Sequence, residues 1–123
     1  MNAMAALKQY QTVNTQAEVF DASPHRLIQM LMEGGLTRLA QAKGAMARGD
    51  IAQKGLLLGK AIDILIGLRD GLNPEKTDDP ASLQQLDNLY AYMMTRLMEA
   101  NRENDAAIID EVAGLLETLK SGW

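Results

Sequence analysis

Few side chains in this sequence could carry out chemistry, and the most reactive of them stands alone. His25 is the only histidine, it follows the pair Ser23-Pro24, and the chain has no cysteine. A lone imidazole could act as a general base, but a catalytic triad needs further partners and a His-rich metal site needs a second histidine. A di-iron bundle needs Glu-x-x-His pairs, which the sequence lacks. We therefore expect His25 to be a surface or partner-contacting residue rather than a catalytic one.

Neighbouring carboxylates and one pair of glycines are the other candidates for chemistry. Asp78-Asp79 falls on an expected loop and Asp110-Glu111 on a polar helix face, where solvated charge is the simpler interpretation. Gly34-Gly35 is not a phosphate loop, because no strand precedes it and no Gly-Lys-Ser/Thr follows. These residues indicate neither an enzyme nor a cofactor site.

Length and charge exclude several further classes of protein. The 123 residues fit one domain that can bury a core, and the net charge is -4, with twelve basic residues scattered among sixteen acidic ones. That balance argues against nucleic acid as a partner. No apolar run approaches the roughly 20 residues of a membrane span, and the first residues lack the apolar core of a signal peptide. We expect a soluble protein that is not secreted by the general pathway, with no cofactor and no membrane insertion.

Apolar spacing and helix-start signals predict four helices. Ser23 and Asp79 each stand before a proline as N-caps, Asp50 precedes Gln53 by three residues as in a capping box, and Asp105 caps the last helix. The expected helices run from Pro24 to Gly49, from Ile51 to Leu72, from Pro80 to about Asn101 and from Asp105 toward Trp123. Short connections then favour an all-α, antiparallel up-down four-helix bundle as a single domain over residues 23–123.

Residues 1–22 are only weakly patterned. Leu7, Tyr10 and Val13 make one short helical stripe, and a polar stretch follows them. We expect this segment to form a loosely docked N-terminal arm.

The second and third predicted helices carry more apolar residues than a bundle core needs, which is about three in seven. Between Ala61 and Leu68 only Asp63 is charged. Such a helix must be covered on all sides, by a tight core, by a homodimer face or by a partner helix in a groove. Methionines gather in the first and third helices, and their flexible side chains favour the groove. The mid-helix pair Gly34-Gly35 predicts either the close approach of another backbone or a kink.

A set of short motifs, in order along the chain, carries a family resemblance. They are Leu7-Lys8-Gln9-Tyr10, Ala22-Ser23-Pro24-His25, Leu27-Ile28, Met30-Leu31, Gly59-Lys60-Ala61-Ile62, Leu89-Tyr90, Tyr92-Met93, Ala100-Asn101, Asn104-Asp105, Glu111-Val112, Leu115-Leu116 and Trp123. Together they resemble the flagellin export chaperones of the FliS family nearly end to end. The sequence departs from that family at Met32, where an aromatic residue is usual, and at Gly35, where alanine is usual.

The resemblance implies a chaperone that binds the disordered C-terminal segment of flagellin in apolar grooves. Such a chaperone prevents flagellin from polymerising prematurely and delivers it to the flagellar export gate. Some similar proteins also bind an anti-sigma factor or a co-chaperone. We expect the groove to be lined by Met32, Ile62, Leu65, Ile66, Met93 and Met94, with polar contacts from Tyr92 and Arg96. Leu7 and Tyr10 match the arm positions of the family, and we expect them to cap the empty groove. The alternative is a homodimeric helical scaffold that uses the same apolar face for self-association.

Overall fold

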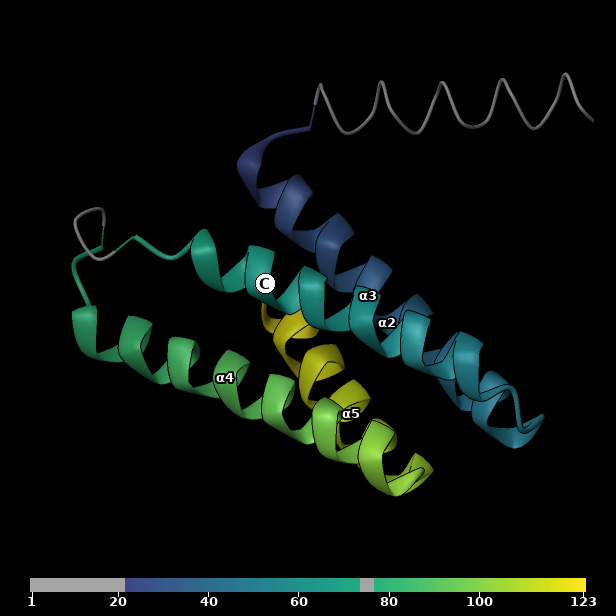
Figure 1. The fold of residues 1–123 in the computed structure, drawn as a ribbon. Coiled ribbons are helices and arrows are strands. Elements are labelled where there is room, and N and C mark those ends of the chain that lie inside the picture. Colours follow the sequence, from purple (N-terminus) through teal and green to yellow (C-terminus); the bar gives the residue numbers. More distant parts are fainter. Residues whose placement is uncertain (1–21, 74–76) are drawn as a thin grey trace, which may run out of the picture.

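The described part of the chain forms a bundle of four antiparallel helices (Figure 1). The computed structural model describes residues 22–73 and 77–123. Its helices are α2 (Pro24–Ala47), α3 (Ile51–Asp70), α4 (Pro80–Glu103) and α5 (Ala106–Gly122), and the described residues include no strand. Each helix packs against the next, and α5 returns to pack against α2. The predicted all-α up-down bundle is confirmed, whereas the expected N-terminal arm lies outside the described residues.

Each helix begins at the N-cap that the sequence predicts: Ser23, Asp50, Asp79 and Asp105. In every case the side-chain oxygen accepts a backbone N–H of the first turn, as Ser23 Oγ does from Arg26 at 3.1 Å. These bonds satisfy donors that have no partner inside the helix. The helix starts could be predicted because capping depends on residues that are close in sequence.

Three helix ends differ from the prediction by two residues. α2 ends at Ala47 rather than Gly49, and Arg48 is its C-cap. α3 ends at Asp70 rather than Leu72, because the chain turns at Gly71. α4 extends to Glu103 rather than Asn101 and stops at Asn104, which adopts a left-handed conformation with φ 56°. Asparagine tolerates this conformation better than most residues, which makes it a good helix terminator.

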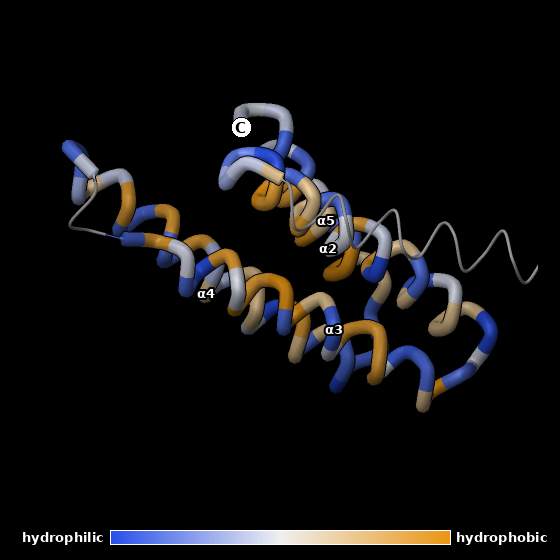
Figure 2. Tube along the Cα trace, turned by 90° about the horizontal axis from the view of Figure 1, so that it is seen from above, coloured by the Kyte–Doolittle hydropathy of each residue, from blue (hydrophilic) through white to orange (hydrophobic). Residues whose placement is uncertain are grey.

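The core runs the length of the bundle and draws side chains from all four helices. Its largest fully buried members are Met32, Leu39, Leu58, Leu65, Met93, Leu97, Ile109, Val112 and Leu116. Hydrophobic residues also recur along α3 and α4 outside this set (Figure 2). None of the helices that the structure describes is long and apolar enough to cross a membrane.

The glycine pair of α2 lies where neighbouring side chains come close. A Cβ built on Gly35 would lie 3.0 Å from Leu116 Cδ2 of α5, and one on Gly34 would lie 3.6 Å from Ile64 Cδ1 of α3. The helix itself is continuous through the pair. Gly35 therefore permits close packing, but the nearest atoms belong to side chains rather than to the backbone that the sequence suggested.

Candidate partner-binding surface

The eight residues expected to contact a partner lie in three different environments. Met32, Leu65 and Met93 are at most 2% exposed and belong to the core. A side chain with so little accessible surface cannot touch a partner while the bundle keeps this packing. The remaining five, Ile62, Ile66, Tyr92, Met94 and Arg96, are at least partly accessible.

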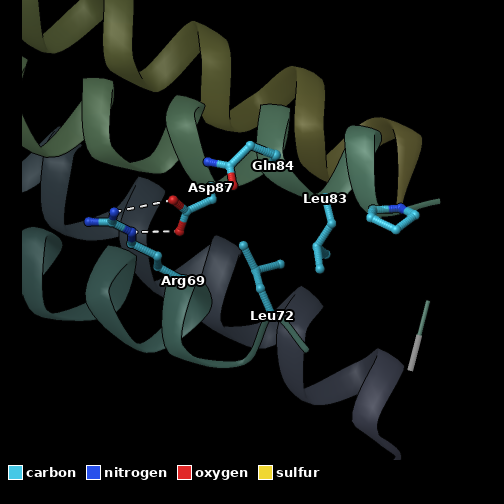
Figure 3. Close-up of a pocket in the computed structure, with 6 residues that line it drawn as sticks. Arg69, Leu72, Leu83, Gln84 and Asp87 are labelled. Carbon is cyan, nitrogen blue, oxygen red and sulfur yellow. Dashed lines mark hydrogen bonds and ion pairs between the residues drawn. The ribbon is translucent and has the colours of Figure 1, made fainter. Parts of the chain in front are cut away.

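Two polar bridges fix how α3 lies against α4. Near the end of α3, Arg69 donates from Nε to Asp87 Oδ1 at 2.6 Å and from Nη2 to Asp87 Oδ2 at 3.2 Å (Figure 3). At the other end, Lys54 Nζ donates to the carbonyl oxygen of Asn101 at 3.1 Å and to Asn104 Oδ1 at 2.9 Å. Because the helices are antiparallel, these bridges set a register that brings the middle of α3 level with the middle of α4.

Apolar residues line the outer edge of this contact on both helices. The spacing of Ile62 and Ile66 places them on the flank of α3 that carries Arg69, and the register brings them level with Met94 and neighbouring residues of α4. Ile66 is 39% exposed, and Met98, one turn beyond Met94, is 54% exposed. We call this surface the α3–α4 seam and define it by Ile51, Gly55, Gly59, Ile62, Ile66, Ala91, Met94 and Met98.

The middle of the seam is open because two of its residues have no side chain. A Cβ built on Gly55 or on Gly59 would meet nothing within 4 Å. Ile51, at the first position of α3, is 74% exposed. Neither Ile51 nor Met98 was among the eight residues predicted to contact a partner. Met98 belonged to the apolar excess already noted, whereas the exposure of Ile51 depends on the position of the α4 C-terminus, which the sequence does not indicate.

A pocket lies at each end of the seam. The first, about 360 Å³, is lined by Arg69, Leu72, Pro80, Leu83, Gln84 and Asp87. Figure 3 shows Leu72 and Leu83 pointing toward one another from the end of α3 and the start of α4, beside the Arg69–Asp87 bridge. The second, about 320 Å³, is lined by Met46, Gly49, Asp50, Ile51, Lys54 and Asn104. The seam with its two pockets could hold a helical segment with an anchoring side chain at either end.

Tyr92 and Arg96 lie on the opposite flank of α4, toward α5. Arg96 donates from Nε to Glu111 Oε1 at 2.7 Å and from Nη1 to Glu99 Oε2 at 2.6 Å, and the Tyr92 hydroxyl donates to Glu111 Oε2 at 3.1 Å. The hydrogen bonds from Arg96 and Tyr92 lower the pKa of the Glu111 carboxyl. The expected polar contacts with a partner would therefore compete with bonds that already join α4 to α5.

His25 is exposed and has a structural neighbour. Its ring stacks on Trp123 at a centroid distance of 5.1 Å and an interplanar angle of 13°, and Trp123 Nε1 donates to the His25 carbonyl oxygen at 2.9 Å. This clasp joins the start of α2 to the end of α5. Within residues 22–73 and 77–123, no cluster of His, Cys, Asp or Glu could hold a metal ion. Leu7 and Tyr10, expected to cap the groove, lie outside the described residues.

Comparison with known proteins identifies the family. The family profile described as flagellar protein FliS matches residues 6–123. The flagellar secretion chaperone FliSB of Pseudomonas aeruginosa is 57% identical over 123 residues, covering 100% of this chain and 96% of its own. The flagellar secretion chaperones FliS of Vibrio cholerae and Salmonella typhimurium are 42% and 41% identical, covering 96% and 100% of this chain and 85% and 90% of their own lengths. The chain therefore belongs to the FliS family of flagellar proteins.

Proposed function

We propose that this protein is a cytoplasmic, non-enzymatic chaperone of flagellar export that binds the disordered C-terminal segment of flagellin. Its similarity to proteins named flagellar secretion chaperones supports the role. The observation that carries the binding site is the exposed apolar seam on a small acidic bundle. An apolar surface flanked by pockets is typical of a docking site for an amphipathic helix.

The proposed mechanism is burial of the part of flagellin that would otherwise assemble. The client segment orders on the α3–α4 seam with apolar residues against Ile62, Ile66, Met94 and Met98. Each buried Leu or Ile of the client contributes about 1.5–3 kcal/mol, offset in part by the entropy lost when the segment orders. A segment held in this way cannot polymerise, and the complex can be passed to the export gate.

Met32, Leu65 and Met93 stay outside the proposed contact surface because they are buried. The second part of the proposal concerns residues 1–22. Through Leu7 and Tyr10, this segment covers the empty seam, and it moves aside when the client binds. Deletion of residues 1–16 should then increase the binding of a hydrophobic dye by the free protein. Unchanged dye binding would indicate that the segment does not cover the seam.

Calorimetric titration with a synthetic peptide of the flagellin C-terminal segment tests the main proposal. We expect saturable binding with a negative heat-capacity change and a gain of helical circular dichroism. Ile66→Asp should weaken binding about tenfold or more, because it places a charge where apolar contact is needed. Leu27→Asp on α2 is the matched control, since Leu27 is 37% exposed and Ile66 39%.

Self-association is the competing use of the same surface. Light scattering on the purified chain separates the two. A stable dimer that does not bind the peptide, and that Ile66→Asp converts to a monomer, would replace the chaperone proposal with the scaffold alternative.

A further inference from the structure

Lys54 is a buried cation that makes two side-chain hydrogen bonds within the described part of the chain. Its side chain is 5% exposed, yet both of its acceptors, the Asn101 carbonyl and the Asn104 side chain, are neutral. An ammonium group has three N–H donors, and a buried charge is usually paired with an opposite charge. No carboxylate among residues 22–73 and 77–123 lies within ion-pair distance of Nζ. Two of the three N–H donors of Lys54 thus bind the C-terminal end of α4. Neither acceptor among the described residues carries the negative charge that would neutralise the ammonium group.

Lys54 and its acceptor Asn104 both line the second pocket of the seam. Its volume is about 320 Å³, and Met46 and Ile51 provide apolar surface next to Lys54. Asp50 also lines the pocket, but its Oδ1 accepts the backbone N–H of Gln53 at 3.1 Å as the N-cap of α3. The pocket thus combines apolar surface with a cationic residue that is only 5% exposed.

We propose that this pocket, the Lys54 pocket, receives an acidic side chain of the bound client, with an adjacent apolar client residue against Ile51 and Met46. This inference rests on the proposed function, because the pocket is one end of the α3–α4 seam. The client carboxylate accepts the remaining N–H of Lys54 and neutralises its charge. Such a charge-assisted bond is strong when water is excluded, and a neutral client residue would leave the ammonium group without that partner.

A charged contact at one end of the seam can fix the register of a bound helix, which apolar contacts alone do not. The hydrophobic effect is non-directional, so a helix lying on Ile62, Ile66, Met94 and Met98 could slide by one turn at little cost. A carboxylate bound at Lys54 favours one register over its neighbours, as buried polar groups do in coiled coils. The Lys54 pocket therefore determines where the client segment starts on the seam and which segments fit.

The experiment varies the client and the chaperone together. Each Asp and Glu of a synthetic peptide of the flagellin C-terminal segment is changed in turn to Asn or Gln, and binding is measured by calorimetry to the full chain and to Lys54→Met. We expect one peptide substitution to weaken binding to the parent protein about tenfold or more and to have little effect on Lys54→Met. If every substitution weakens binding to both proteins equally, the pocket does not bind an acidic side chain. If amidation of the peptide C-terminus is the only change that couples to Lys54, the carboxylate is the terminal one and the side-chain assignment is wrong.

A second pair of variants keeps the inference testable if Lys54→Met does not fold. Ile51→Asp places a negative charge at the rim of the pocket and should weaken peptide binding about tenfold. Leu56→Asp is the control, because Leu56 is 52% exposed on the same helix but lies about 140° around its axis from Ile51. Equal binding by the two variants overturns the Lys54 pocket. Failure of the parent protein to bind the unmodified peptide overturns the proposed function instead.

Discussion

Arg69 and Asp87 form a bidentate ion pair that holds the first half of α4 against the end of α3. Few residues in the first half of α4 are buried, so this pair is one of the contacts that fix it to the bundle. The hydrogen bond from Arg69 lowers the pKa of the Asp87 carboxyl, and Arg96 does the same for Glu111 at the α4–α5 contact. Two arginine–carboxylate pairs thus attach α4 to both of its neighbours.

These pairs predict how stability depends on pH. A carboxyl whose pKa is lower in the folded chain stabilises the fold above its unfolded pKa, about 4, and this contribution disappears as the pH falls through the folded value. Asp87→Asn combined with Glu111→Gln should therefore lower the free energy of unfolding at pH 7. The difference from the parent protein should narrow as the pH falls below about 4. Urea unfolding followed by circular dichroism measures this difference in free energy, with the exposed Asp78→Asn as the control. A difference that does not narrow as the pH falls below about 4 would mean that packing, not charge, is lost.

The methionines of α4 predict a separation of stability from binding. Met93 is fully buried and Met98 is 54% exposed. Met93→Ala should lower the free energy of unfolding by about 2–5 kcal/mol, because it leaves a cavity in the core. Met98→Ala should change it by less than about 0.5 kcal/mol and weaken peptide binding. Denaturant unfolding and calorimetry check the two effects, and a large stability loss in Met98→Ala would place that residue in the core.

The glycine pair of α2 predicts a difference between adjacent positions. Gly34→Ala should raise the free energy of unfolding by up to about 1 kcal/mol, since alanine favours the helix and its Cβ makes an ordinary contact with Ile64. Gly35→Ala gains the same helix propensity but places Cβ 3.0 Å from a methyl group of the buried Leu116. We expect Gly35→Ala to be the less stable of the two by urea unfolding. Leu116→Val should cost less in the Gly35→Ala background than in the parent protein, and equal costs would rule out the contact as the cause.

The clasp between His25 and Trp123 predicts a fluorescence change, because Trp123 is the only tryptophan in the chain. His25→Ala should shift the emission toward that of a solvated indole, speed amide exchange in the last turn of α5 and destabilise the bundle by about 0.5–1 kcal/mol. His25→Phe keeps a flat ring at this position and should preserve most of the parent behaviour. Identical spectra for the parent protein and His25→Ala would show that the stack does not persist in solution.

Features of this fold that depend on residues close in sequence could be predicted, and features that depend on packing between helices could not. The N-caps at Ser23, Asp50, Asp79 and Asp105 could be predicted because a cap and the N–H that it accepts lie within three residues. Which residues of each helix belong to the core and which to the surface could not be predicted from the sequence. Met93 and Met94 are neighbours in sequence, yet Met93 is buried and Met94 is a partly exposed member of the seam, because successive residues of a helix point about 100° apart. On helices that are apolar on several sides, only the positions of the other helices decide which residues remain exposed.

Long-range polar pairs were beyond the sequence for the same reason. Tyr92 and Arg96 were expected to face a partner, but both bond to Glu111, which stands on another helix. Lys54 gave no signal at all, because its acceptors lie 47 and 50 residues further along the chain. Periodicity identifies the faces of a helix but not the side chains that will meet them.

The two glycines of the seam lie on the surface of the bundle and do not contribute side chains to its core. Gly55 and Gly59 have open space where a Cβ would stand, and replacing glycine by alanine generally favours a helix. Larger residues can therefore appear at these positions and reshape the surface without disturbing the interior. On the proposed function, single substitutions at Gly55 or Gly59 would change the shape of the docking surface while the bundle stays folded.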